Sequence, residues 1–167
     1  TVIFDAGLAP GIPNFLLGEI DAKENVKSFK YFVGGLPKHP KPPYNYKAPF
    51  SPIDVVEEYT RPARIMKNGE VITKPALTDI ETKTYQNIGM LEGFNTDGLR
   101  SILSTMKHIP NMVEKTLRFP GHAELISKEL ASGKIVSGDK NNLQRLFKIW
   151  KLLPNELEFT VLDVFIE

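Results

Sequence analysis

Residues 90–122, MLEGFNTDGLRSILSTMKHIPNMVEKTLRFPGH, contain the pattern around which the rest of the chain can be arranged. A strand-like run opens the stretch, a turn and a short helical run follow, and a second strand leads into an Arg-Phe-Pro-Gly-His corner. The stretch has about the length of one βαβ unit. Polar residues stand at the ends of its apolar runs, where a site built on rigid elements would place its chemistry: Asn95, Thr96, Asp97, Arg118 and His122.

The segments on either side alternate between strand and helix patterns. Strands are predicted over 2–5, 27–33, 63–67, 70–74, 80–84, 88–94, 112–119 and 157–166, and helices over 13–22, 52–59, 96–106, 120–132 and 139–150. Asn68-Gly69 predicts a tight hairpin. The order of elements predicts an α+β fold with a mixed, mainly antiparallel sheet and helices packed on one face. The proline-rich stretch 36–49 carries Tyr44 and Tyr46, which favours an ordered loop over a flexible linker.

Length and composition limit the classes of protein to which the chain can belong. The 167 residues suit one domain, 1–167, with 41% hydrophobic and 25% charged residues. A net charge of +1 argues against a nucleic-acid partner. No apolar run is long enough for a membrane span, and no signal-peptide pattern occurs, so we expect no membrane partner and a cytoplasmic location. The absence of cysteine excludes disulfides and thiolate metal sites.

Three segments could bind a ligand, and each also has a structural interpretation. The loop 5–11 (DAGLAPG) lies between a strand and a helix, where backbone can approach an anion, although a plain turn would look the same. Arg61 and Arg64 could grip a carboxylate or pair with nearby glutamates. Arg118 and His122 flank a helix start whose free N–H groups would complete a carboxylate pocket, yet such a pair is as often structural.

Other chemistries have weaker support in the sequence. The three histidines are scattered without metal-ligand spacing, so no metal is expected. Residue types alone leave a Ser-His-Asp triad open, but no nucleophile elbow occurs. The stripe Leu143, Phe147 and Trp150 indicates core or interface.

Five motifs, each weak alone, occur in an order that resembles the saccharopine dehydrogenase-like enzymes, closest to the lysine 6-dehydrogenase branch. They are DAGLAPG (5–11), YFVGGLP (31–37), FSPIDVVEEYTRPAR (50–64), LEGFNTDGLR (91–100) and TLRFPGHAE (116–124). The resemblance implies a substrate-binding and dimerisation domain, similar in fold to the C-terminal domain of glyceraldehyde-3-phosphate dehydrogenase. It also implies a homodimer and a preceding Rossmann domain that binds NAD or NADP. These residues contain no GxGxxG motif, and the strand-like ends favour a piece of a longer two-domain enzyme, so we expect the isolated chain to be inactive.

The resemblance also implies roles for particular residues in oxidation of a CH–NH bond of an amino acid such as lysine or saccharopine. Catalysis would fall to Asp5, facing the substrate ammonium, and to His122, as the titrating group. Substrate binding would fall to Arg61, Asn95, Thr96 and Arg118, and contact with the nicotinamide to Gly7, Pro10 and Gly11.

The saccharopine group carries Asp in the place of Ala9 and lacks an acid at Asp5, so the reversed pattern here favours a smaller amine substrate. The alternative function is a non-catalytic protein-interaction domain of the same fold, suggested by the Pro/Tyr loop.

Overall fold

The computed structural model describes the backbone of residues 1–167 and every side chain except that of Lys140. The helices are α1 (Ile12–Asp21), α2 (Pro52–Thr60), α3 (Ile102–Thr105), α4 (His122–Ala131) and α5 (Lys140–Trp150). The strands are β1 (Ser28–Pro37), β2 (Ala63–Lys67), β3 (Glu70–Lys74), β4 (Glu81–Tyr85), β5 (Gly89–Asn95), β6 (Asn111–Arg118) and β7 (Glu158–Ile166).

Strands β1 and β6 form the centre of the sheet, and they are its one parallel pair. β7 pairs antiparallel with the other edge of β1, and β2 and β5 share the remaining edge of β6. The mixed, mainly antiparallel sheet is therefore confirmed. Residues 90–122 have about the length of a βαβ unit but do not form one, because β5 and β6 pair antiparallel with Glu92 opposite Arg118. A parallel pair would need a crossover that carries the chain back to its starting end, and the segment that contains α3 only reverses the chain.

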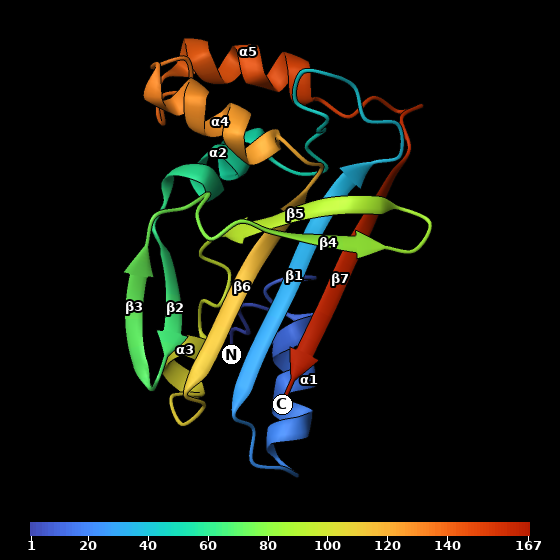
Figure 1. Ribbon diagram of the computed structural model, residues 1–167. Helices are drawn as coiled ribbons and strands as arrows, with labels where there is room; N and C mark the ends of the chain where they lie inside the picture. Colours follow the sequence, from blue (N-terminus) through green and yellow to red (C-terminus); the bar gives the residue numbers. More distant parts are fainter.

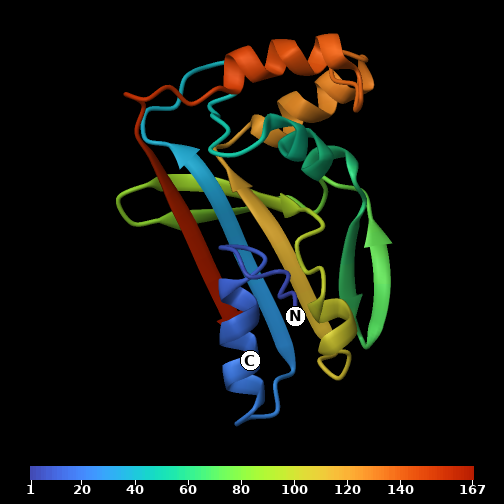
Figure 2. The same cartoon turned by 180° about the vertical axis from the view of Figure 1, so that it is seen from behind.

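Some of the helices lie on a face of the sheet, and the others lie at one of its ends. α1 and α3 lie on one face, here called the helical face (Figure 2). Leu17, Leu99 and Tyr31 belong to the hydrophobic cluster on this face. The β4–β5 hairpin crosses the opposite face (Figure 1). Phe32 is buried there in one cluster with Leu91 of β5. α2, α4 and α5 gather at the end of the sheet at which β1 and β6 finish (Figure 1). Packing on one face thus describes α1 and α3, while the other three helices form a separate layer at that end.

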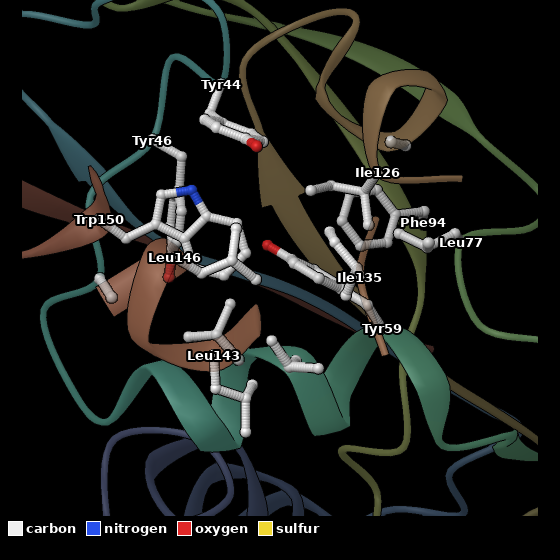
Figure 3. Packing of buried hydrophobic residues seen from close by; sticks show 14 residues of the cluster. Tyr44, Tyr46, Tyr59, Leu77, Phe94, Ile126, Ile135, Leu143, Leu146 and Trp150 are labelled. Atoms are coloured by element: carbon white, nitrogen blue, oxygen red, sulfur yellow. The ribbon is translucent and has the colours of Figure 1, made fainter. Parts of the chain in front are cut away.

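This end of the sheet holds an aromatic group that includes Tyr44, Tyr46, Tyr59 and Trp150 (Figure 3). The His122 ring packs against Tyr46 and Tyr59, and we call these five residues the tyrosine cluster. The indole of Trp150 meets the rings of Tyr44 and Tyr46 edge-on, with centroids 5.5 and 5.6 Å apart. Edge-to-face pairs at this spacing add to the stability that area burial supplies. Because its tyrosines are buried here, the proline-rich stretch is ordered, as predicted.

Local sequence signals were more accurate than long-range ones. The hairpin turns at Asn68-Gly69, and the Asp139 side chain caps α5 by accepting hydrogen bonds from the amides of Asn141 and Asn142. The strand predicted at 2–5 is wrong, because this segment is irregular and the Phe4 side chain is 71% exposed. The helix predicted over 96–106 is only α3.

Candidate functional site

Two adjoining cavities open on the helical face of the sheet, between loop 5–11, β1, β6 and α2. The larger has a volume of about 360 Å³ and the smaller about 100 Å³. Four residues line both cavities, which makes them one continuous cleft: Ala9, Val33, Glu58 and Thr116. This cleft is the candidate site, because it gathers charged side chains on a rigid sheet.

Loop 5–11 forms one wall of the cleft and is closed by its own backbone. The amide of Gly7 donates to the carbonyl of Pro10 at 3.0 Å, and the amide of Ile12 donates to the carbonyl of Gly7 at 3.1 Å. Gly11 has a φ of 152°, and a Cβ there would lie 1.8 Å from the Gly7 oxygen, so only glycine fits. Of the three residues expected to contact a cofactor, Pro10 lines the cleft, while Gly7 and Gly11 build the loop.

The structure places Asp5 outside the lining of the cleft. Its Oδ2 atom accepts a hydrogen bond of 3.0 Å from the amide of Ser101, the residue that precedes α3. This contact ties the N-terminal segment to the start of α3. The role predicted for Asp5, contact with a substrate ammonium, gains no support from this position.

Arg118 is buried in the wall of the larger cavity and is held on several sides. Its Nε donates to the Tyr59 hydroxyl at 3.0 Å, and its guanidinium carbon lies 4.3 Å from the centroid of the Tyr46 ring. Nη2 lies 3.5 Å from Oε2 of Glu58. Burial raises the pKa of Glu58 while the Arg118 charge opposes that rise. Arg118 therefore contacts both the tyrosine cluster and the cleft, and its positive charge lies in the wall of the cleft.

His122 lies behind Tyr59 and outside the lining of both cavities. Nε2 is 2.9 Å from the Tyr59 hydroxyl and Nδ1 is 2.8 Å from the Tyr44 carbonyl, so both ring nitrogens have partners. Burial, reinforced by the positive charge of Arg118, lowers the pKa of His122 to about 3. The imidazole is therefore neutral and satisfied inside the tyrosine cluster. This position gives no support to the predicted catalytic role.

The free helix N–H groups predicted after Pro120 are not free, and that part of the expected carboxylate pocket is wrong. Glu92 reaches the start of α4 from β5 and accepts hydrogen bonds from the amides of Gly121 and Ala123, at 3.0 and 2.6 Å. The protein's own carboxylate thus occupies the position that a ligand carboxylate would take.

Asn95 and Thr96 are neighbours in sequence but point to opposite sides, as successive strand residues do. The Asn95 amide donates to Thr78 and Asp79, away from the cleft. The Thr96 hydroxyl lines the smaller cavity, where it donates to Oε2 of Glu114 at 2.7 Å. Of the two predicted substrate contacts, the structure brings only Thr96 into the cleft.

Glu114 lines this cleft and was not predicted from the sequence. It is 2% exposed, and besides Thr96 it accepts a hydrogen bond of 3.1 Å from the amide of Gly98. Burial raises the pKa of Glu114 to about 8. A signal was present in the sequence, since Glu114, Thr116 and Arg118 alternate along one strand and therefore share one face.

Two further arginines stand at the smaller cavity. Arg61, predicted to bind substrate, lines it and also pairs with Glu57 one helical turn away at 2.5 Å. Arg100 lines it as well and lies 3.5 Å from the buried carboxylate of Asp97. Arg64 lines neither cavity and donates two hydrogen bonds to the carboxylate of Asp97, of 2.9 and 2.8 Å.

The cleft is lined by arginines and by acidic side chains. Three arginines (Arg61, Arg100, Arg118) and three acids (Glu58, Asp97, Glu114) line it. Such a cleft suits a ligand that carries both carboxylate and ammonium groups. Among the side chains that the structure describes, no group of three His, Cys, Asp or Glu could hold a metal ion. None of the helices in the described chain is long and apolar enough to cross a bilayer.

Comparisons with known proteins agree with one another. The family model of the saccharopine dehydrogenase C-terminal domain matches residues 7–165. Mitochondrial alpha-aminoadipic semialdehyde synthase is 30% identical over 148 residues in Mus musculus and 31% over 150 residues in Bos taurus. Each alignment covers 81% of this chain and 16% of the relative, so the chain spans about a sixth of the length of these proteins.

Among solved structures, saccharopine dehydrogenase (L-Glu forming) from Saccharomyces cerevisiae shares the fold. The TM-score is 0.58 at 22% identity, over 75% of this chain and 32% of the yeast chain. The lysine 6-dehydrogenase branch and the likeness to glyceraldehyde-3-phosphate dehydrogenase stay predictions. The family match covers nearly the whole sequence, and the fold agrees with it. This chain therefore belongs to the saccharopine dehydrogenase C-terminal domain family.

Proposed function

We propose that this chain is the substrate-binding domain of an NAD(P)-dependent dehydrogenase that acts on a CH–NH bond of an amino acid of the lysine or saccharopine class. The observation that carries the proposal is the cleft, where three arginines and three acids face one space beside loop 5–11. An amino acid offers the complementary charges. The family relatives are named for saccharopine and aminoadipic semialdehyde chemistry, which fits such a substrate.

The arrangement of charges suggests how the substrate would lie. Arg118 is fixed by Tyr59 and Tyr46, so its guanidinium is already oriented for a carboxylate at the larger cavity. Arg61 and Arg100 would meet a second polar group at the smaller cavity. The reacting nitrogen would then lie between them, over Thr96 and Thr116.

The family implies a nicotinamide cofactor, and this chain fits only the reacting end of it. Leu8, Ala9 and Pro10 present a mainly apolar edge to the cleft, which suits a flat ring. The loop's closing amides are already hydrogen-bonded within the loop, so they offer little to a pyrophosphate. When bound, the nicotinamide supplies hydride transfer. The rest of NAD or NADP would be held by a domain outside this chain, and we expect the isolated chain to be inactive.

The test uses the full-length protein that contains these residues, assayed for NAD⁺ and NADP⁺ reduction with L-lysine and with saccharopine. We expect reduction with at least one of the two. A protein that binds neither compound and reduces neither cofactor would overturn the proposal.

Arg118→Ala sharpens this test. Loss of a charged hydrogen bond to the substrate carboxylate should raise KM about 10- to 100-fold. Arg145→Ala is the matched control, since this arginine pairs with Glu129 and Tyr44 away from the cleft. An unchanged KM in a folded Arg118→Ala protein would remove Arg118 from the site.

Two further expectations remain proposals. A homodimer is expected from the resemblance, and light scattering of the full-length protein would contradict it by finding a monomer at every concentration. The cytoplasmic location rests on sequence patterns alone. The interaction-domain alternative loses its main motivation, because Tyr44 and Tyr46 of the Pro/Tyr loop are buried.

A further inference from the structure

We propose that Glu114 is the catalytic acid–base of this cleft and exchanges a proton with the substrate nitrogen. This inference rests on the proposed function, and it assigns to Glu114 a role that the sequence had suggested for Asp5 and His122. It is carried by the position of the two carboxyl oxygens relative to the smaller cavity.

The two oxygens of Glu114 have different surroundings. The hydroxyl of Thr96 and the amide of Gly98 both donate to Oε2, at 2.7 and 3.1 Å. Among the described residues no donor reaches Oε1, and Oε1 is not among the buried polar atoms sealed from solvent. Glu114 lines the smaller cavity, so Oε1 is the oxygen that faces it. Because Oε2 already accepts two hydrogen bonds, the proton of the acid form belongs on Oε1, directed at the cavity.

The carboxyl is held rigidly in this orientation. The Thr96 hydroxyl lies 2.7 Å from that of Thr116, which fixes the donor to Glu114 from the other side. Gly98 permits the close approach, because a Cβ there would lie 2.5 Å from the carboxyl carbon. A proton-transfer group needs such fixed geometry toward the reacting atom.

The charged groups around the smaller cavity allow Glu114 to be either protonated or ionised. The other titratable or charged residues that line this cavity are Tyr31 on β1, Glu58 on α2, Arg61 directly after α2, and Asp97 and Arg100 before α3. Asp97 stays ionised, because the Arg64 hydrogen bonds outweigh burial and lower its pKa. Glu114 has no arginine within hydrogen-bond distance among the described side chains, and burial raises its pKa to about 8. Of these two acids, Glu114 alone can gain and lose a proton near neutral pH.

A substrate ammonium N–H bond breaks, an O–H bond forms at Oε1, and the nitrogen keeps the electron pair. A bound nicotinamide would supply hydride transfer from the neighbouring carbon, and the electron pair on nitrogen would then form the C=N bond. In the reverse direction the protonated carboxyl returns the proton to nitrogen.

The first measurement does not depend on turnover. Binding of L-lysine or saccharopine to the full-length protein is measured by calorimetry at pH 7, in two buffers of different ionisation enthalpy. An ammonium placed beside the protonated carboxyl favours its ionisation, so the wild type should release up to one proton. Glu114→Gln should bind within about threefold of the wild-type Kd and release none. Its amide oxygen can accept from Thr96 and Gly98, which keeps the local hydrogen bonds.

Glu58→Gln is the matched control for calorimetry, since it removes the other glutamate of the cleft. It should keep a proton release, smaller than that of the wild type, because the Glu58 charge adds to burial in raising the pKa of Glu114. If Glu58→Gln abolishes the release and Glu114→Gln does not, the proposal is overturned.

The second measurement is the pH profile of kcat/KM for oxidation. The wild type should rise with pH and level off above about 8, where Glu114 becomes the base. Glu114→Gln should lose this rise and about 10²- to 10⁴-fold in rate. An unchanged profile in this variant would overturn the assignment. If the wild type binds neither compound and reduces neither cofactor, the proposed function itself fails, which is a different result.

A second pair of variants covers the case in which Glu114→Gln does not fold. Thr96→Val removes a donor that favours the ionised carboxyl, so the rise in kcat/KM should move to higher pH. Thr96→Ser keeps the hydroxyl and should restore the wild-type position. If both variants leave the profile in place, the proposal fails.

Discussion

The tyrosine cluster and the cleft both contain a fully buried titratable group, and the two groups differ in how completely they are bonded. His122 in the cluster has a partner on each ring nitrogen, the Tyr59 hydroxyl and the Tyr44 carbonyl. Glu114 in the cleft has both hydrogen bonds on one oxygen, and the other oxygen faces a cavity. Both ring nitrogens of His122 therefore have partners, whereas one carboxyl oxygen of Glu114 is left to contact a ligand.

The difference teaches that burial and a shifted pKa do not by themselves make a site. Burial lowers the pKa of His122 to about 3 and raises that of Glu114 to about 8, so both are strongly perturbed. Buried ion pairs and structural networks perturb pKa values as well. Only an unsatisfied atom that faces open space can act on a ligand. By this criterion the cleft is the candidate site, and the tyrosine cluster supports it through Arg118.

The largest expected effect concerns the pH dependence of stability through Glu114. Its folded-state pKa of about 8 lies above the ordinary 4.5, so the folded protein holds the proton more tightly and loses stability as pH rises through this window. The upper limit is the difference of 3.5 between about 8 and 4.5 at about 1.4 kcal/mol per pKa unit, or roughly 5 kcal/mol. In Glu114→Gln the free energy of unfolding should fall less between pH 5 and 9. Urea denaturation at several pH values measures it, and parallel curves for the two proteins would contradict the prediction.

A smaller effect is expected when one hydroxyl group is removed from the tyrosine cluster. Tyr59→Phe removes the hydroxyl that bonds to His122 and accepts from Arg118, leaving one buried nitrogen atom of each residue without a partner. We expect a loss of about 3 kcal/mol in the free energy of unfolding. Tyr46→Phe is the matched control, because the Tyr46 hydroxyl is buried without a partner among the described residues and should change stability little. Equal losses in chemical denaturation would refute the comparison.

The smallest effect concerns the start of α4, where Glu92 takes the place expected for a ligand. Glu92→Gln replaces one of its two acceptor oxygens by a donor that cannot bond to a helix amide. We expect a loss of about 1 kcal/mol, typical of a helix N-cap. Glu124→Gln on the exposed first turn of the same helix should stay within about 0.5 kcal/mol. Thermal unfolding of both variants decides the point, and a Glu92→Gln protein as stable as the control would contradict it.

The sequence predicted the region of the candidate cleft but only part of the residues that line it. Arg61, Thr96, Arg118 and Pro10 do line the cleft. Asp5, Asn95 and His122 do not, since each is bonded to another part of the protein. Whether a polar residue faces a cleft or a neighbouring chain segment depends on which face of a strand it occupies and on what packs there. Residue type and motif position do not contain that information.

Features that depend on neighbours within a few residues could be predicted from the sequence. The turn at Asn68-Gly69, the cap at Asp139 and the ordered set of motifs that marks the family are of this kind. Their physics is local, because turn geometry and helix capping involve residues less than one helical turn apart.

Contacts between residues far apart in the sequence depend on how the whole chain folds. Glu92 reaches amides about 30 positions away, and Thr96 meets Glu114 18 positions away. Both contacts follow from the antiparallel register of β5 and β6, since a shift of one residue would turn each side chain to the opposite face. That register is set by the packing of the whole sheet. The carboxyl oxygen of Glu114 that faces the cavity could therefore not be predicted from the sequence.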